Sequence, residues 1–264
     1  MKIMISYPPF KGIKGTPLLS QNRQYQVFSE RTVIYPIVPA SAATLLKQSG
    51  HEVIWNDCIA QNWTEEQFFK FVQKEKHDLI AFETKTPVIK QHWKIINELK
   101  ELNELNKPKI VLFGDHVTAL PEESFQNSGV DFVLTGGDYD FLLLNLCNVL
   151  KNLPLTELEP GIYYRDNGQI KNTGPFQLNH DLNPLPFIDR DLSRWQLYAY
   201  KNGNYKRTPG TYIMSGRDCW YHNCTFCSWP MLYPQFRVRN TENVLDEIGI
   251  LIDKYKIREI MDDT

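Results

Sequence analysis

The strongest constraint on the fold is an alternation, along residues 1–150, of short apolar runs with longer amphipathic segments. The apolar runs have the composition of buried strands, and the longer segments have the period of helices. Strands are predicted at 2–6, 52–56, 78–83, 109–113 and 132–135, and helices at 40–48, 65–76, 88–102, 121–128 and 139–150. Strands joined through helices form right-handed crossovers and a parallel sheet covered on both faces. We therefore predict an α/β fold that begins with a doubly wound, Rossmann-like parallel sheet.

The predicted carboxyl ends of these strands are the candidate ligand site, because doubly wound sheets bind ligands there. Small and hydroxyl residues at these ends let a bulky ligand approach the backbone closely. The candidate residues are Ser6, Tyr7, Thr84, Gly114, His116, Thr118, Gly136 and Gly137. For any single one of them, a role in an ordinary turn or helix cap is the alternative. No G-x-G-x-x-G sequence follows the first strand, so a nicotinamide cofactor is not expected.

The composition changes after residue 150, which divides the chain into three predicted parts, 1–150, 151–210 and 211–264. Residues 151–210 carry six prolines and five glycines and are predicted to form an ordered bridge packed between domains. Within the bridge, Asn167 and Gly168 lie between two short runs, a pattern that predicts a β-hairpin. The third part is predicted to contain strands at 211–215 and 259–261 and a helix at 241–255.

Three of the five cysteines, Cys219, Cys224 and Cys227, lie within nine residues. The odd total and the lack of a signal peptide argue against a disulfide framework, so this cluster indicates metal or redox chemistry. Iron–sulfur clusters are held by cysteine thiolates, and three thiolates would leave one iron open to a further ligand. Zinc, held by the three thiolates and His222, is the alternative that local chemistry leaves open.

The composition excludes several classes of protein. The chain is 42% hydrophobic and 23% charged, with a formal net charge of −2, which is typical of a globular protein without a strong electrostatic field. No apolar run approaches the roughly 20 residues of a membrane helix. We therefore expect a cytoplasmic protein with no membrane contact and no nucleic-acid partner.

The predicted strand at 211–215, the cysteine loop and the helix after it resemble the opening of a radical S-adenosylmethionine enzyme. This resemblance implies that Cys219, Cys224 and Cys227 hold a 4Fe–4S cluster, whose free iron chelates the amino and carboxylate groups of S-adenosylmethionine. It also implies that Phe226 lies near the adenine. The first gap between cysteines is four residues and not the usual three, a departure that some cobalamin-dependent members share.

The resemblance extends over nearly the whole chain. Residues 39–57, 114–121 and 130–138 look like parts of a cobalamin-binding domain, 182–186 like the bridge, and 237–239, 247–248 and 262–264 like the start of the barrel. It implies a sheet of the cobalamin-binding type, followed by the first part of a partial TIM barrel with Asp263 beside S-adenosylmethionine. No Asp-x-His-x-x-Gly loop follows the first strand to supply a cobalt ligand. For His116, a structural role is favoured over that of a substitute ligand.

The function implied by the resemblance is methyl transfer to an unactivated carbon. Reductive cleavage of S-adenosylmethionine would give a 5′-deoxyadenosyl radical, and methylcobalamin would deliver the methyl group to a small-molecule or peptide substrate. A flavodoxin or ferredoxin would donate the electron. The alternatives are a cyclase or rearrangement enzyme of the same architecture, or a non-catalytic flavodoxin-like module with a zinc-stapled tail. Because the later barrel strands are missing from the sequence, we expect this chain to be an inactive fragment of a longer enzyme.

Overall fold

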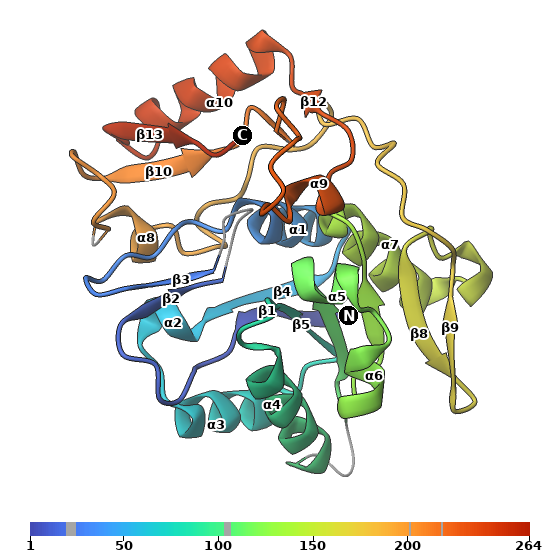
Figure 1. Cartoon of the computed structure of the whole chain (residues 1–264). Coiled ribbons are helices and arrows are strands. Elements are labelled where there is room, and N and C mark those ends of the chain that lie inside the picture. Colours follow the sequence, from blue (N-terminus) through green and yellow to red (C-terminus); the bar gives the residue numbers. More distant parts are fainter. Residues whose placement is uncertain (20–24, 103–106, 201, 218) are drawn as a thin grey trace.

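The computed structural model describes residues 1–19, 25–102, 107–200, 202–217 and 219–264. Within these residues, the centre of the molecule is a seven-stranded sheet with the order β4-β1-β5-β6-β7-β8-β9 (Figure 1). Its strands are β1 (Lys2–Tyr7), β4 (Glu52–Asp57), β5 (Leu79–Glu83), β6 (Lys109–Phe113), β7 (Phe132–Leu134), β8 (Ile162–Asp166) and β9 (Gln169–Asn172). The first five strands pair in parallel, so in chain order they follow the flavodoxin-like arrangement 2-1-3-4-5. The predicted doubly wound sheet is confirmed.

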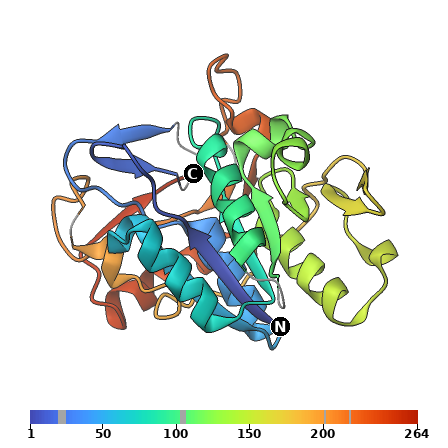
Figure 2. The same cartoon turned by 90° about the horizontal axis from the view of Figure 1, so that it is seen from below.

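Helices cover both faces of this sheet, with α1 and α7 on one face and α3 and α4 on the other (Figures 1 and 2). The helices of this part are α1 (Ile37–Gln48), α2 (Cys58–Gln61), α3 (Glu65–Glu75), α4 (Ile89–Leu102), α5 (Asp115–Ala119), α6 (Glu123–Asn127) and α7 (Tyr139–Asn152). Successive strand residues alternate between the two cores. Ile3 and Ile5 pack with α1 and α7, whereas Met4 packs with α3 and α4.

A local signal explains where α3 begins. The sequence predicts Thr64 as the cap of α3, and the Thr64 side chain accepts a hydrogen bond from the backbone N–H of Gln67, whose own side chain accepts from the Thr64 N–H. Other bounds differ from the prediction. Helix α1 begins at Ile37, before the predicted start at residue 40. The helix predicted at 121–128 is present as the shorter α6, and α5 before it was not predicted.

The bridge contributes its hairpin to the central sheet. The predicted hairpin is present as β8 and β9, and β8 pairs antiparallel with β7, so the sheet continues beyond residue 150. The bridge also contains a 3₁₀ turn, η1 (Leu155–Glu157), and α8 (Gln196–Ala199). The stretch after β1, where no strand is predicted, contains a small antiparallel pair, β2 (Thr16–Leu18) and β3 (Gln26–Phe28).

The C-terminal part is a βαβ unit that lies above α1 in Figure 1. Strands β10 (Gly210–Ile213) and β13 (Glu259–Asp262) pair in parallel and are connected through α10 (Thr241–Asp253). Between β10 and α10 lie the antiparallel pair β11 (Gly216–Arg217) and β12 (Arg237–Val238) and the short helix α9 (Trp229–Leu232). The predicted strand–loop–helix–strand order is confirmed.

Helix α1 is buried on nearly all sides because it lies between the sheet and this C-terminal part. Residues of both parts, including Ala42 of α1, Tyr212 of β10 and Leu232 of α9, belong to one hydrophobic core. The two parts are therefore packed as one body. In the part of the chain that the structure describes, no helix has the length and apolar composition needed to cross a membrane.

Candidate functional site

The loops after β5, β6 and β7 form one continuous rim at the carboxyl ends of the strands. Gly114 has φ +117°, and a Cβ added there would lie 2.4 Å from the carbonyl oxygen of Thr84. The Thr118 hydroxyl donates to the carbonyl oxygen of Gly114 at 2.8 Å and accepts from the backbone N–H of Gly136 at 3.0 Å. Four of the predicted residues, which come from three loops, are therefore neighbours: Gly114 lies against Thr84 and is bonded to Thr118, and Thr118 is bonded to Gly136. Only glycine lets the backbones approach so closely at position 114.

A buried carboxylate, which sequence analysis did not identify, lies at the ends of β1 and β5. Glu83 accepts hydrogen bonds from the hydroxyl groups of Tyr7 and, at 3.3 Å, of Tyr139. Burial raises the pKa of Glu83 to about 7, although Lys85 opposes the shift. The neighbouring Ser6 hydroxyl donates to the side-chain oxygen of Asn56 at 2.9 Å. A glutamate that ends the apolar run Leu79–Glu83 was the available signal, because a carboxylate inside a sheet needs partners.

The side chain of His116 lies between the loop after β5 and helix α6. Its Nδ1 lies 3.1 Å from the Thr86 hydroxyl, and its Nε2 lies 3.0 Å from a carboxylate oxygen of Glu123. The side chain is buried. These contacts join neighbouring turns, and the role of His116 in the site stays a prediction.

Thr84 is supported from below by His92 of α4, whose Nδ1 lies 2.8 Å from the Thr84 hydroxyl. The imidazole is fully buried, and burial lowers its pKa to about 3. The folded protein therefore binds the proton less tightly than the unfolded chain, whose histidine has a pKa of roughly 6.5. Stability that depends on neutral His92 is present above pH 6.5 and is lost as the pH falls towards 3.

This shift gives a prediction for the pH dependence of stability. Between pH 7 and pH 5, the free energy of unfolding of the wild type should fall by about 2 kcal/mol more than that of His92→Gln. Urea unfolding of both proteins at the two pH values measures the difference. His77, whose pKa burial lowers to about 4, contributes equally to both proteins and cancels. Parallel pH profiles for the two proteins would contradict the prediction.

The two glycines after β7 are approached by protein side chains. A Cβ added to Gly136 would lie 2.5 Å from the ring of Phe176, and one added to Gly137 would lie 2.1 Å from the ring of Tyr233. The Gly137 N–H also donates to the carbonyl oxygen of Leu232 at 2.9 Å. The close approach that these glycines allow is thus made by the bridge and by the segment after the cysteines. Their contact with a ligand stays a prediction.

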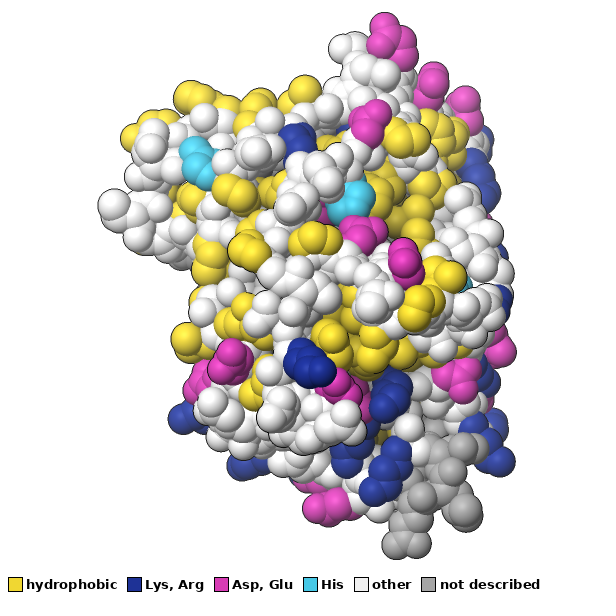
Figure 3. Space-filling view, turned by 90° about the vertical axis from the view of Figure 1, so that its right-hand side faces the viewer, with side chains coloured by type: hydrophobic (Ala, Val, Ile, Leu, Met, Phe, Trp, Pro, Cys, Tyr) yellow, Lys and Arg dark blue, Asp and Glu magenta, His cyan; other side chains and the backbone are white. Residues whose placement is uncertain are grey.

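The cysteine loop lies between β11 and α9 and projects from the body of the molecule (Figure 2). The three cysteines are partly exposed and form no disulfide in the described part of the chain, and the Cys227 N–H donates to the carbonyl oxygen of Cys224 at 3.2 Å. The side chain of Phe226 is 76% exposed. Apolar side chains gather in the upper half of Figure 3, whereas Lys and Arg gather in the lower half.

The donor set of this loop fits an iron–sulfur cluster, since three thiols in one accessible loop are the ligands such clusters use. The sulfur atoms are not gathered around one point. Among the described residues, no three Cys, His, Asp or Glu side chains are arranged to hold a metal ion. Cluster binding would therefore require the loop to close around its ligand.

Asp263 lies where the carboxyl ends of β10 and β13 meet. Its backbone N–H donates to the carbonyl oxygen of Ile213 at 2.9 Å. The next residue, Thr264, accepts from the Gly216 N–H at 3.0 Å, only three residues before Cys219. The structure thus brings Asp263 to the strand ends from which the cysteine loop starts.

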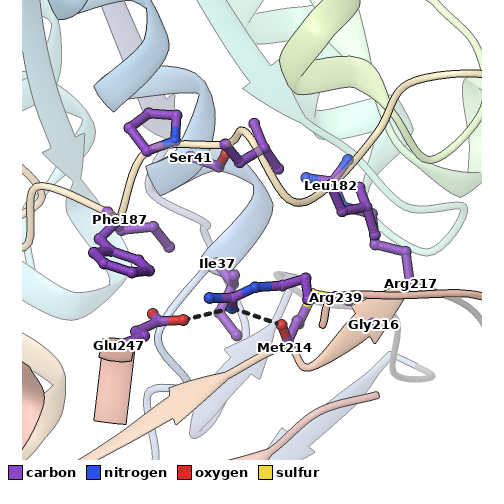
Figure 4. Close-up of a pocket in the computed structure, with 12 residues that line it drawn as sticks. Ile37, Ser41, Leu182, Phe187, Met214, Gly216, Arg217, Arg239 and Glu247 are labelled. Carbon is purple, nitrogen blue, oxygen red and sulfur yellow. Dashed lines mark hydrogen bonds and ion pairs between the residues drawn. The ribbon is translucent and has the colours of Figure 1, made fainter. Parts of the chain in front are cut away.

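A cavity of about 50 Å³ lies between α1, the bridge, β11 and α10 (Figure 4). Its charged lining residues are paired within the protein. Arg239 contacts Glu247 and donates to the carbonyl oxygen of Met214, and Arg217 binds aspartates of the first part. The volume has room for only a few water molecules, so this cavity is not a cofactor site.

Comparison with known proteins agrees with this architecture. Residues 31–141 match the B12 binding domain family. An uncharacterized methyltransferase of Pyrococcus horikoshii is 25% identical over 232 residues, which are 87% of this chain and 49% of the relative. The anaerobic magnesium-protoporphyrin IX monomethyl ester cyclase of Rubrivivax gelatinosus is 23% identical over 236 residues, 84% of this chain and 40% of the relative. The chain thus spans about half, or less, of the length of these relatives.

Solved structures of two radical S-adenosylmethionine enzymes have a similar fold. The methyltransferase TsrM from Kitasatospora setae, with cobalamin and a 4Fe–4S cluster bound, aligns over 99% of this chain and 47% of its own, with a TM-score of 0.64 and 14% identity. The cobalamin-dependent enzyme OxsB aligns over 99% of this chain and 33% of its own, with a TM-score of 0.71 and 17% identity. Residues 31–141 thus match the B12 binding domain family, and the chain has the same fold as the aligned parts of these two radical S-adenosylmethionine enzymes.

Proposed function

We propose that this chain supplies the cobalamin-binding domain and the cluster-binding loop of a radical S-adenosylmethionine methyltransferase. The observation that carries the proposal is the position of the cysteine loop. The loop with three partly exposed thiols begins after Arg217 and ends before Leu232, and both of these residues bind the turn after β7. This turn continues the rim, because the Gly136 N–H donates to Thr118. A cofactor on the rim and a cluster in the loop would then be neighbours.

In this proposal each group of residues has a separate task. Cys219, Cys224 and Cys227 hold the 4Fe–4S cluster, and the exposed Phe226 ring flanks the adenine of S-adenosylmethionine. The rim and Glu83 border the corrin. When bound, the cluster passes an electron from a flavodoxin or ferredoxin to S-adenosylmethionine, and cobalamin supplies the methyl group for an unactivated carbon of the substrate.

A second candidate function is ring formation with the same three cofactors, the 4Fe–4S cluster, S-adenosylmethionine and cobalamin. Its support is the match to the anaerobic magnesium-protoporphyrin IX monomethyl ester cyclase. The residues that hold the cofactors would be the same, so the two candidates differ in the substrate and in the fate of the substrate radical. A non-catalytic module with a zinc-stapled tail differs already in its metal.

Cofactor binding by the full-length protein, purified anaerobically and reconstituted with iron and sulfide, tests the proposal. We expect about four iron and four sulfide per chain and a brown protein. Bound zinc in place of iron would favour the zinc-stapled module. Equilibrium dialysis should also show retention of hydroxocobalamin, and its absence would contradict the cobalamin part of the proposal.

A matched pair of glycine variants tests the rim. Gly114→Ala should weaken cobalamin binding roughly tenfold, or about 1.4 kcal/mol, because the added Cβ would push apart the loops after β5 and β6. Gly168→Ala is the control, since Gly168 also has positive φ but meets no atom within 4 Å and lies in the β8–β9 turn. Equal cobalamin affinity in the two variants would exclude the rim from the binding site.

A further inference from the structure

The segment that carries the cysteines, residues 217–233, is bonded at both of its ends to residues 137–140 of the B12-binding domain. Before the cysteines, the side chain of Arg217 binds Asp138 and Asp140, which follow β7. After the cysteines, the carbonyl oxygen of Leu232 accepts from the Gly137 N–H at 2.9 Å. The segment that carries the three thiols thus leaves and returns to the same turn, residues 137–140.

The first attachment is a buried ion-pair network. Arg217 Nη1 lies 2.9 Å from Asp138 Oδ1 and 2.8 Å from Asp140 Oδ1, while its Nη2 binds the second oxygen of Asp140. All three side chains are buried, and the guanidinium lies 5.5 Å from the centre of the Phe141 ring. Arg237 of β12 makes two further bonds to Asp138, at 2.7 and 2.8 Å. Such two-point contacts fix the direction of a guanidinium as well as its position.

The second attachment uses an aromatic residue. Tyr233, directly after α9, is fully buried, and its ring fills the space left by the missing side chain of Gly137. Its hydroxyl donates to the carbonyl oxygen of Gly137 at 2.9 Å. Both backbone groups of Gly137 are thereby bound to the segment after the cysteines.

We propose that Asp138 and Asp140 are positioning residues for the cluster loop, acting through Arg217. The inference rests on the proposed function and extends it: the B12-binding domain orients the cysteine loop besides holding its own cofactor. The same turn also continues the cobalamin rim, because Gly136 donates to Thr118. A rigid turn shared by both sites couples the geometry of the cluster to that of the cobalamin domain.

The test compares Asp140→Asn with Asp131→Asn in the full-length protein. Asp131 lies directly before β7, at the opposite end of the strand from Asp138, and pairs with Lys100 and Lys109. Its variant therefore also removes a carboxylate paired with cations, but not one that binds the segment of the cysteines. The first readout uses the cluster-free protein: alkylation of Cys219, Cys224 and Cys227 by iodoacetamide, followed by mass spectrometry. The second uses the reconstituted protein: the change in the electron paramagnetic resonance spectrum of the reduced cluster on titration with S-adenosylmethionine.

We expect Asp140→Asn to alkylate roughly tenfold faster than wild type and to need about 10–100 times more S-adenosylmethionine for the spectral change. Asp131→Asn should behave as wild type in both readouts. Asp140→Glu keeps a carboxylate for Arg217 and should therefore be close to wild type in both readouts. Tyr233→Phe, which removes one hydroxyl at the other attachment, should shift both readouts in the same direction and serves if Asp140→Asn does not fold.

Two failures are distinguishable. A wild-type protein that takes up no iron refutes the proposed function, while the alkylation rates still report on the attachment of the loop. A wild-type protein with a normal cluster, together with Asp140→Asn and Tyr233→Phe variants that match Asp131→Asn in both readouts, overturns the positioning role and leaves the proposed function standing.

Discussion

The Cys224→Ala protein is expected to assemble no 4Fe–4S cluster. Cys224 lies between the other two cysteines of the loop, and its partly exposed thiol is accessible to iron and sulfide. Only three thiols are close enough in the chain to act as cluster ligands, and clusters are normally held by cysteine thiolates. Removing one leaves two protein ligands, so we expect complete loss of bound iron and of the brown colour.

Iron and sulfide analysis after anaerobic reconstitution measures this loss, with Cys147→Ala as the control. Cys147 is fully buried in α7, where burial raises the pKa of its thiol to about 12 and keeps it protonated. A protonated thiol enclosed in the core is no metal ligand, so this variant should retain the wild-type iron content. An intact 4Fe–4S spectrum in Cys224→Ala would show that the loop does not hold the cluster.

The central sheet could be predicted because its determinants are local in the sequence. Each parallel strand, such as Leu79–Glu83, is an apolar run between turn residues, and each long helix has an apolar face at helical spacing. The B12-binding type of the domain came from the resemblance, and the match over residues 31–141 supports it. The short helices α5 and α6 were predicted less well, because their bounds depend on the packing of the loop after β6.

The parts of the site that were missed depend on residues far apart in the chain. Arg217 and Asp140 are 77 positions apart, and nothing near either residue indicates the other. The same holds for Gly137: its sequence context predicts space for a close neighbour, but only the fold shows that Tyr233 fills it. Glu83 and its two tyrosines come from three separate elements. Local sequence patterns thus identified the loops of the site, but they could not identify the side chains that the fold brings into contact with these loops.

Arg190→Met is expected to lower the free energy of unfolding by about 2–3 kcal/mol, because buried hydrogen-bond acceptors lose a charged donor. Arg190 belongs to the bridge, is 1% exposed and lies 4.5 Å from the centre of the Tyr35 ring. Its guanidinium donates to the Thr211 hydroxyl and, at 3.0 Å, to the carbonyl oxygen of Tyr212, and it lies 3.3 Å from Glu247. The methionine would fill the space but remove the guanidinium donor from Thr211 and from the carbonyl oxygen of Tyr212, whereas Glu247 keeps its ion pair with Arg239.

Urea unfolding measures the effect, with Lys254→Met as the control. Lys254 pairs with Asp191 at 3.0 Å on the surface, where both side chains are more than half exposed, and such pairs contribute about 0–1 kcal/mol. Each variant removes one positive charge, so the difference between their losses in free energy of unfolding measures the effect of burying the charge. Equal losses would mean that Arg190 is replaceable by packing alone. A larger loss in Arg190→Met would show that the buried guanidinium stabilises the packing of the C-terminal part against the first part. Its contacts reach Tyr212 of β10, Glu247 of α10 and the Tyr35 ring before α1.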